Sequence, residues 1–161
     1  MRKKIVLNKS KTKGMIVNYS YKYLFITRLY IENELIELVQ EAKLLGTIIT
    51  SDLSWWENTN YLCKKGYQRM AIIRKLYEFS VPACDLVQIY TLFVRSILEF
   101  NSCVWHFNLT QEQSNELERV QKVACKVILK DEYSSYDSAL ISLDLKRLSE
   151  RRKDLCTKFE K

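Results

Sequence analysis

Carboxylates that could hold catalytic metal ions are sparse in this sequence. Two-metal phosphoryl transfer needs carboxylates that converge, commonly from a tight strand-turn-strand element with adjacent acids, and the chain contains no Asp-Asp pair. Its nearest equivalent, Asp131-Glu132, falls among turn-forming residues, so we interpret it as a solvated acidic turn. Three scattered glycines cannot form a loop that cradles phosphate with backbone amides. The sequence therefore predicts no metal site and no nucleotide-binding loop.

The single histidine and the five cysteines give little reason to expect catalysis. His106 is a candidate general base, but its neighbours Trp105 and Phe107 favour a packing role, and no nucleophile elbow accompanies it. No two cysteines have the Cys-x-x-Cys spacing that zinc fingers use. The wide spacing is typical of reduced thiols inside a cell. An enzyme centred on His106 is the last of three alternatives that the sequence leaves open.

Basic side chains at helical spacing form the clearest functional pattern. Lys122, Lys126 and Lys130 are four residues apart, so on a helix their ammonium groups align along one face. Two interpretations stay open: a solvated face screened by salt, or a ridge that follows phosphates. Two other predicted helices add further candidates for contact with a nucleic-acid backbone, namely Lys64, Lys65, Arg69, Arg151 and Arg152. Together these faces predict sequence-independent binding of nucleic acid that weakens with salt.

The composition is typical of a basic, largely helical globular domain. The 161 residues include 26 Lys and Arg against 19 Asp and Glu, a net charge of +7, with three Gly and one Pro. This charge favours a polyanionic partner, either nucleic acid or an acidic membrane surface. No apolar run approaches the roughly 20 residues that span a bilayer, and no secretory signal is recognisable. We expect an intracellular protein, nuclear or cytoplasmic, with no membrane partner and no small-molecule substrate.

The basic N-terminal part is predicted to form strands. Residues 1–31 hold eight Lys or Arg and no acid. Their β-branched and aromatic residues favour strands near 12–18 and 22–31, joined by a turn at 18–20. A third short strand is expected over 43–49, where Gly46 is unusual unless backbone has to approach closely. We therefore predict a small antiparallel β unit over residues 1–51.

Helical periodicity begins near Ser54, the expected N-cap of a first helix that ends before Pro82. A second helix begins near Ala83, and its apolar residues cover most of its circumference, which predicts the most buried helix. Thr110 is expected to cap a third helix over 111–129. Shorter helices are expected over 136–141 and 145–160.

These elements predict an α+β fold, mainly α. A short N-terminal antiparallel hairpin or three-stranded unit should lead into a bundle of three to four helices over residues 52–161. Trp105 is expected in the core. Trp55 and Trp56 are neighbours at a helix start, so they cannot both face inward.

An ordered series of short motifs extends through nearly the whole chain. It consists of Leu-Asn-Lys-Ser-Lys-Thr-Lys-Gly-Met at 7–15, Lys-Leu-Leu-Gly at 43–46, Asp-Leu-Ser-Trp at 52–55, Leu-Glu-Phe-Asn-Ser-Cys-Val-Trp at 98–105, Leu-Glu-Arg-Val-Gln-Lys at 117–122, Tyr136 with Ala139-Leu140, and Leu148 with Arg151-Arg152 and Phe159. In order and spacing, the series resembles the reverse transcriptases of non-long-terminal-repeat retrotransposons, of the jockey and LINE-like type.

The resemblance implies roles for several residues. Lys11 matches the lysine of an Asn-x-x-Lys-Thr palm motif that assists departure of pyrophosphate, and Lys13 follows it as a candidate nucleic-acid contact. Leu45-Gly46 matches the primer-grip hairpin, where Gly46 would let backbone approach the primer end. The helices after Ser54 would correspond to the thumb, which closes over RNA-DNA hybrid or duplex.

The resemblance also implies what the chain lacks. The family's catalytic carboxylates, which bind Mg²⁺, precede the first matched motif, so we expect no cofactor here and no polymerisation by this chain alone. The chain then looks like part of a longer reading frame, with the palm and fingers as a candidate partner. The second alternative is a protein-interaction remnant that exposes Phe25, Leu29 and Ile31, or else a stand-alone basic helical module that binds nucleic acid. Asn101 stands where the family usually has Gly, and Asn tolerates a positive φ better than most residues.

Overall fold

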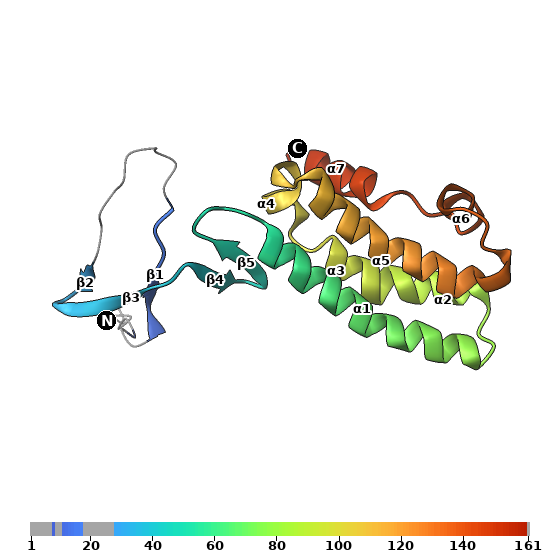
Figure 1. Ribbon diagram of the computed structural model, residues 1–161, viewed down its shortest axis with the longest axis horizontal. Helices are drawn as coiled ribbons and strands as arrows, with labels where there is room; N and C mark the ends of the chain where they lie inside the picture. The colour runs from blue at the N-terminus through green and yellow to red at the C-terminus, as the bar shows by residue number, and fades with distance from the viewer. Residues whose placement is uncertain (1–7, 9–10, 18–27, 161) are drawn as a thin grey trace, which may run out of the picture. The chain divides into compact units, whose positions relative to one another are not determined.

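The structure is a computed structural model that describes residue 8, residues 11–17 and residues 28–160. The chain divides into two compact units, Met1–Glu57 and Asn58–Lys161, the first built from short strands and the second from helices (Figure 1). The predicted α+β class, mainly α, is confirmed. The division falls at Glu57, whereas the sequence places it after residue 51.

Three strands of the first unit form a small mixed sheet in the order β1-β3-β2. These are β1 (Lys13–Gly14), β2 (Leu29–Ile31) and β3 (Glu34–Leu38). β2 and β3 are antiparallel, whereas β1 is parallel to β3, so the expectation of a purely antiparallel unit is wrong. The sequence did not predict β3, because its two glutamates lower its strand propensity. The predicted turn at 18–20 and residues 22–27 of the predicted strand lie outside the described residues.

A separate hairpin follows, made of β4 (Glu41–Leu44) and β5 (Thr47–Thr50). Its two connecting residues, Leu45 and Gly46, both have positive φ, 47° and 93°, as a type I′ turn requires. The prediction of one strand over 43–49 is therefore wrong. Gly46 lies at the turn, where the absence of a Cβ permits its backbone conformation.

Leu45 is poorly suited to this turn. Its side chain is 85% exposed, and a left-handed backbone costs a leucine about 1–2 kcal/mol. Because Asn-Gly is a preferred type I′ pair, we expect Leu45→Asn to stabilise the hairpin by about 0.5–1 kcal/mol. Amide hydrogen exchange in β4 and β5 should then slow about two- to fivefold. Equal or faster exchange would contradict a type I′ turn at this position.

The first helix, α1 (Trp56–Glu78), packs through buried Leu62, Gly66, Met70 and Ile73. A Cβ added at Gly66 would lie 3.0 Å from a Val120 methyl group, so the glycine permits close helix packing. The predicted N-cap is wrong, because the helix begins two residues after Ser54.

Local sequence features near both ends of α1 explain where the helix begins and ends. Ser54 does not cap the helix. It precedes the helix in the chain, and its backbone amide donates a hydrogen bond to the Asp52 carboxylate at 2.9 Å. Trp55 is buried and Trp56 half-buried, so the two tryptophans do divide between environments. The helix ends before Pro82, as predicted, with Ser80 at a φ of 58°.

The second helical segment is continuous but irregular. It consists of α2 (Ala83–Ile89), the π-helical segment η2 (Tyr90–Arg95) and α3 (Ser96–Leu98). Its fully buried residues, Leu86, Tyr90, Val94 and Leu98, are four apart. A π-helical turn holds more residues than an α-helical one, so side chains at this spacing stay on one face. Leu92, Phe93 and Phe100 are exposed, so the expectation that core contacts cover most of the circumference is wrong.

The remaining helices form where the sequence predicts them, and one additional short helical segment was not predicted. Thr110 caps α5 (Gln111–Leu129) through a capping box with Gln113, within the predicted boundaries. The predicted helices near 136–141 and 145–160 are α6 (Tyr136–Ser142) and α7 (Leu148–Phe159). The segment α4 (Ser102–Trp105), with η3 (His106–Asn108), was not predicted. It begins after Asn101, whose φ of 52° is the positive value that asparagine tolerates.

Candidate nucleic-acid interface

The three lysines predicted to form a row are exposed: Lys122 and Lys126 lie on α5, and Lys130 directly follows the helix with a φ of 42°. Four residues advance a helix by about 6 Å, which separates the backbone positions of Lys122 and Lys126 along α5. Each ammonium lies over a tyrosine ring, Lys122 at 5.1 Å from the centroid of Tyr136, Lys126 at 5.4 Å from Tyr133 and Lys130 at 4.0 Å from Tyr77. These cation–π contacts hold the lysines in place while leaving them exposed.

A groove at one end of the row is shared with α1. It has a volume of about 370 Å³ and is lined by Arg74, Tyr77 and Glu78 of α1, by Val123, Lys126 and Val127 of α5, and by Lys130. Arg74 and the two lysines outnumber the single Glu78 here. The groove therefore combines net positive charge with an aromatic ring, a combination that suits a nucleic-acid backbone.

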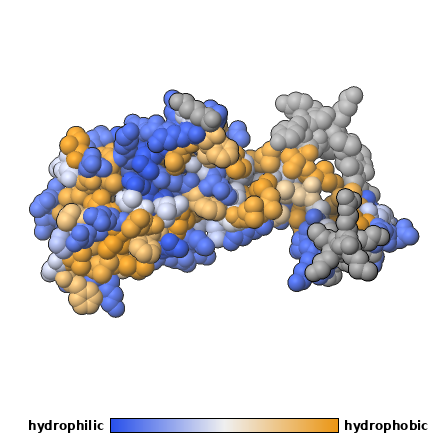
Figure 2. Space-filling model, turned by 180° about the vertical axis from the view of Figure 1, so that it is seen from behind, coloured by the Kyte–Doolittle hydropathy of each residue, from blue (hydrophilic) through white to orange (hydrophobic). Residues whose placement is uncertain are grey.

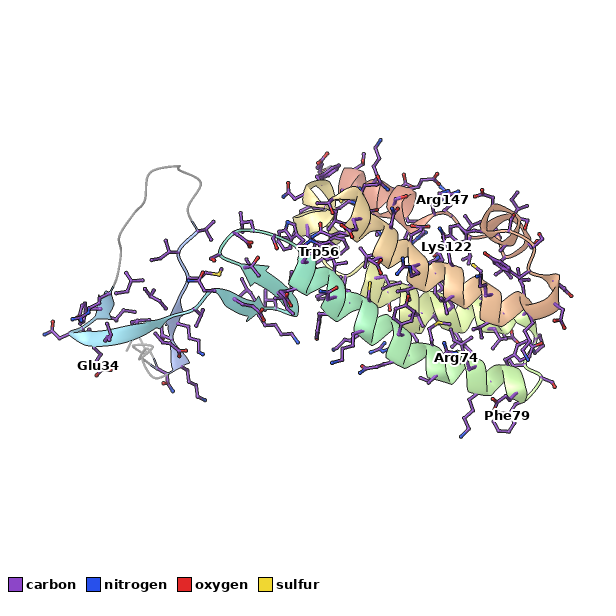
Figure 3. The ribbon with its side chains drawn as sticks, viewed as in Figure 1. Glu34, Trp56, Arg74, Phe79, Lys122 and Arg147 are labelled. Atoms are coloured by element: carbon purple, nitrogen blue, oxygen red, sulfur yellow. The ribbon has the colours of Figure 1, made fainter. Side chains whose placement is uncertain are left out.

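At the other end of the row, Tyr136 lies between two cations. Its ring centroid is 5.1 Å from the Lys122 ammonium and 5.3 Å from the Arg147 guanidinium. Figure 3 shows Lys122 on α5 and Arg147 just before α7. Arg147 also forms an ion pair with Asp137, which offsets part of its charge. We name Arg74, Lys122, Lys126, Lys130 and Arg147 the basic band.

Sequence reasoning missed Arg74 at one end of the band and the contacts between the lysines and the tyrosines. Arg74 was not singled out, because a lone arginine on a polar helix face carries no special pattern. Tyr133 and Tyr136 follow α5 within seven residues of its end, which is the only signal that could have placed aromatic rings near the lysine row. The pairing itself depends on how α6 folds back against α5, which no local pattern encodes.

Glu118 begins the four-residue spacing in the sequence but does not belong to the exposed row. Its side chain is buried and accepts hydrogen bonds from the backbone amides of Leu148 at 3.2 Å and Ser149 at 3.4 Å. These are the first amides of α7, whose positive dipole end favours a carboxylate. Glu118 therefore holds the start of α7 against α5.

A buried chain of hydrogen bonds connects Glu118 to the π-helical segment. The Tyr136 hydroxyl donates to Glu118, and Gln121 donates to the Tyr136 oxygen at 2.9 Å. The Tyr90 hydroxyl donates to Gln121 at 2.7 Å. Burial, and then Glu118, raise the pKa of Tyr136, so its hydroxyl remains a donor. The network fixes the Tyr136 ring on which Lys122 and Arg147 lie.

The predicted candidates on α1 lie apart from the basic band. The Arg69 guanidinium donates to the Phe93 carbonyl of η2 at 2.8 Å, whereas Arg74 borders α5. The Lys65 ammonium lies 4.8 Å from the Tyr61 ring centroid, and Lys64 is exposed. The structure therefore does not bring Lys64, Lys65 and Arg69 together with the lysine row.

The prediction that Arg152 contacts nucleic acid is wrong. Its side chain is fully buried, donates to Ser114 at 3.1 Å and lies 5.8 Å from the Trp105 ring centroid. Arg151 is half-buried and pairs with both oxygens of Glu99, at 2.5 and 3.2 Å. This pair raises the pKa of Arg151 and neutralises its charge. The packing of α7 on α4 and α5 buries Arg152 and leaves Arg151 half-buried.

The predicted candidates in the first unit occupy local turns and strands. Lys11 is exposed, and the Asn8 carbonyl accepts bonds from the Lys11 amide at 3.2 Å and from the Thr12 hydroxyl at 2.9 Å. Lys13 pairs with Glu37 on the neighbouring strand at 3.2 Å. Gly46 forms the β4–β5 turn. Lys11 and Thr12 are thus bonded back to Asn8, and the Lys11 side chain is exposed.

His106 and the acidic residues show no catalytic arrangement in the part of the chain that the structure describes. The His106 ring lies 5.0 Å from the Phe107 ring and its Nδ1 is buried without a hydrogen-bond partner among these residues. Burial and the nearby Arg152 lower its pKa. Trp105 is buried, as predicted. Asp131 and Glu132 are exposed, as expected for a solvated turn.

Residue 8, residues 11–17 and residues 28–160 contain no group of three or more His, Cys, Asp or Glu placed to hold a metal ion. None of the helices in these ranges is both long and apolar enough to cross a membrane. No protein-family model, no curated protein and no solved structure matches the chain.

Proposed function

We propose that the helical unit binds the sugar-phosphate backbone of nucleic acid without reading its sequence. The observation that carries this proposal is the basic band, in which two lysines of α5 and the lysine that follows the helix each rest on a tyrosine ring. Exposed ammonium groups neutralise backbone phosphates. The half-buried tyrosine rings beside them add aromatic surface that sugars and bases can contact.

The motif series adds a more specific proposal. If the chain is the palm end and thumb of a retroelement reverse transcriptase, the band would face the template-primer duplex. The carboxylates that bind Mg²⁺ in that family precede its first matched motif, so this chain should bind but not polymerise. DNA synthesis by the chain on a primed template with Mg²⁺ would contradict that part of the proposal.

A salt titration tests backbone binding. Fluorescence anisotropy of a labelled RNA-DNA hybrid, measured at several salt concentrations, gives the dependence of log K on log salt. Each neutralised phosphate contributes about −0.9 to this slope, so engagement of the band should give about −3 or steeper. Hybrids of unrelated sequence should bind equally. A slope near zero would exclude phosphate binding by the band.

A second candidate function is docking of a protein partner on the first unit. Tyr30 and Leu35 are directly opposite each other on β2 and β3 and are 56% and 61% exposed. Leu29 is also partly exposed, Ile31 is half-buried, and Phe25 lies outside the described residues. Exposed apolar cross-strand pairs favour a protein partner. Absence of hybrid binding even at low salt would favour this second function.

A further inference from the structure

Two cysteines from different helices meet on the helical unit. Cys103 lies on α4 and Cys156 on α7, and these helices pack against each other. Burial, and then a hydrogen bond with the Cys103 side chain, raise the pKa of Cys156, so the two thiols are neighbours. Disulfide formation requires two sulfurs that can approach to about 2.05 Å without large backbone movement. Two hydrogen-bonded thiols on helices that pack against each other are an arrangement from which such a bond can form.

Only one member of the pair is open to solvent. Cys103 is exposed, whereas Cys156 is 2% exposed. Cys103 also lines a groove of about 520 Å³ with Val104, Leu155 and Lys158. The groove admits a small oxidant to Cys103, and Cys156 lies behind it. An accessible thiol backed by a second thiol is the arrangement in which attack on the first is resolved by the second.

The other cysteines do not share this arrangement. Cys63 and Cys125 are buried, and burial raises the pKa of each to about 11, so neither supplies thiolate near neutral pH. Cys84 is exposed on α2 and lines a different groove, beside Thr91 and Arg95. Cys84 is therefore a matched control: an exposed thiol that, among the described residues, shows no hydrogen bond to another cysteine.

We propose that Cys103 and Cys156 form a reversible disulfide that joins α4 to α7. The Cys103 thiolate attacks one sulfur of a small disulfide such as oxidised glutathione, and one glutathione thiolate leaves. The Cys156 thiol loses its proton to water and attacks the Cys103 sulfur, and the second glutathione leaves. Two protein thiols are oxidised and one glutathione disulfide is reduced to two thiols, so electrons and protons balance.

The bond would close a loop of about 50 residues that contains the whole of α5 and α6 and most of α7. Such a cross-link restricts the unfolded chain, so oxidation should raise the Tm by several degrees. It also ties α7 to the turn at Asn101. This proposal does not depend on nucleic-acid binding.

The experiment uses the full chain equilibrated in glutathione buffers of increasing oxidation. Non-reducing peptide mapping should recover a cross-linked pair containing Cys103 and Cys156, and the Tm should rise in the same buffers. Cys103→Ser should abolish both effects, and Cys84→Ser should leave both unchanged. Cys156→Ala should leave Cys103 as a mixed disulfide with glutathione.

Other outcomes overturn the proposal. Recovery of Cys103 only as a glutathione adduct in the unmutated chain would show that Cys156 does not resolve it. A cross-link between two chains through Cys84 or Cys103, without the internal pair, would show that the helices do not permit the bond. An internal pair that persists in Cys103→Ser would place the disulfide elsewhere.

Discussion

Replacing Lys122, Lys126 and Lys130 together by Gln should weaken binding of an RNA-DNA hybrid on the order of a hundredfold near 0.1 M salt. Each ammonium that neutralises a phosphate releases counterions, so the loss of three should make the log K against log salt slope shallower by about 2–3. The loss should be the same for hybrids of different sequence, because backbone contacts carry no base readout. Anisotropy titrations at several salt concentrations measure both quantities.

The matched control removes the same charge elsewhere. Lys64, Lys75 and Lys153 are exposed on α1 and α7, and none of them lines the groove of the basic band or lies over one of its tyrosine rings. Their triple replacement by Gln changes net charge equally but should alter the affinity only a few-fold and the slope by less than about 1. Equal losses in the two variants would mean that overall charge, and not the basic band, attracts the hybrid.

The tyrosines allow a finer test of the same surface. Tyr133→Leu removes the ring under Lys126 but keeps an apolar side chain of similar bulk. We expect affinity to fall only about two- to fivefold, because the ring orients one lysine and no charge is lost. The salt slope should be unchanged, which separates orientation from neutralisation. A change of about 0.9 in the salt slope, the contribution of one neutralised phosphate, would show that the ring does more than orient Lys126.

Elements whose boundaries depend on local chemistry were predicted well. Thr110 and Gln113 form a capping box that fixes the start of α5 whatever packs against it. Pro82 limits α1 in the same local way. The lysine row follows directly from α5, since four-residue spacing on a correctly placed helix fixes a face. This part of the candidate site could therefore be predicted from the sequence.

Features that depend on tertiary contacts could not be predicted. Arg152 has the same helical spacing as an exposed arginine, yet the packing of α7 on α4 and α5 buries it completely. Tyr90 is buried and Phe93 is exposed because η2 is π-helical, which changes the direction of successive side chains. The spacing of apolar residues in the sequence does not show that a segment is π-helical. Glu118 has the same four-residue spacing as the three lysines, although its side chain belongs to the core. The local sequence therefore predicts where helices form, whereas the packing between helices determines which of their side chains are exposed to solvent.

Glu118→Ala should destabilise the helical unit by about 3–4 kcal/mol, a large share of the stability of a domain this size. The carboxylate accepts from two amides at the start of α7 and from the Tyr136 hydroxyl. Alanine would leave these buried donors without an acceptor, and each unsatisfied donor costs about 1–3 kcal/mol. Urea denaturation followed by helical circular dichroism gives the difference in unfolding free energy.

Tyr136→Phe is the partner variant, because it removes one donor to Glu118 and leaves the carboxylate bound to the α7 amides. It should cost only about 1–1.5 kcal/mol. The double variant should then cost less than the sum of the two, since the tyrosine hydroxyl has no acceptor to lose once Glu118 is gone. Strict additivity, or a cost of Glu118→Ala below about 1 kcal/mol, would mean that water replaces the carboxylate readily. In that case Glu118 would not be what holds the start of α7, and the fixed position of Tyr136 beneath Lys122 and Arg147 would need another cause.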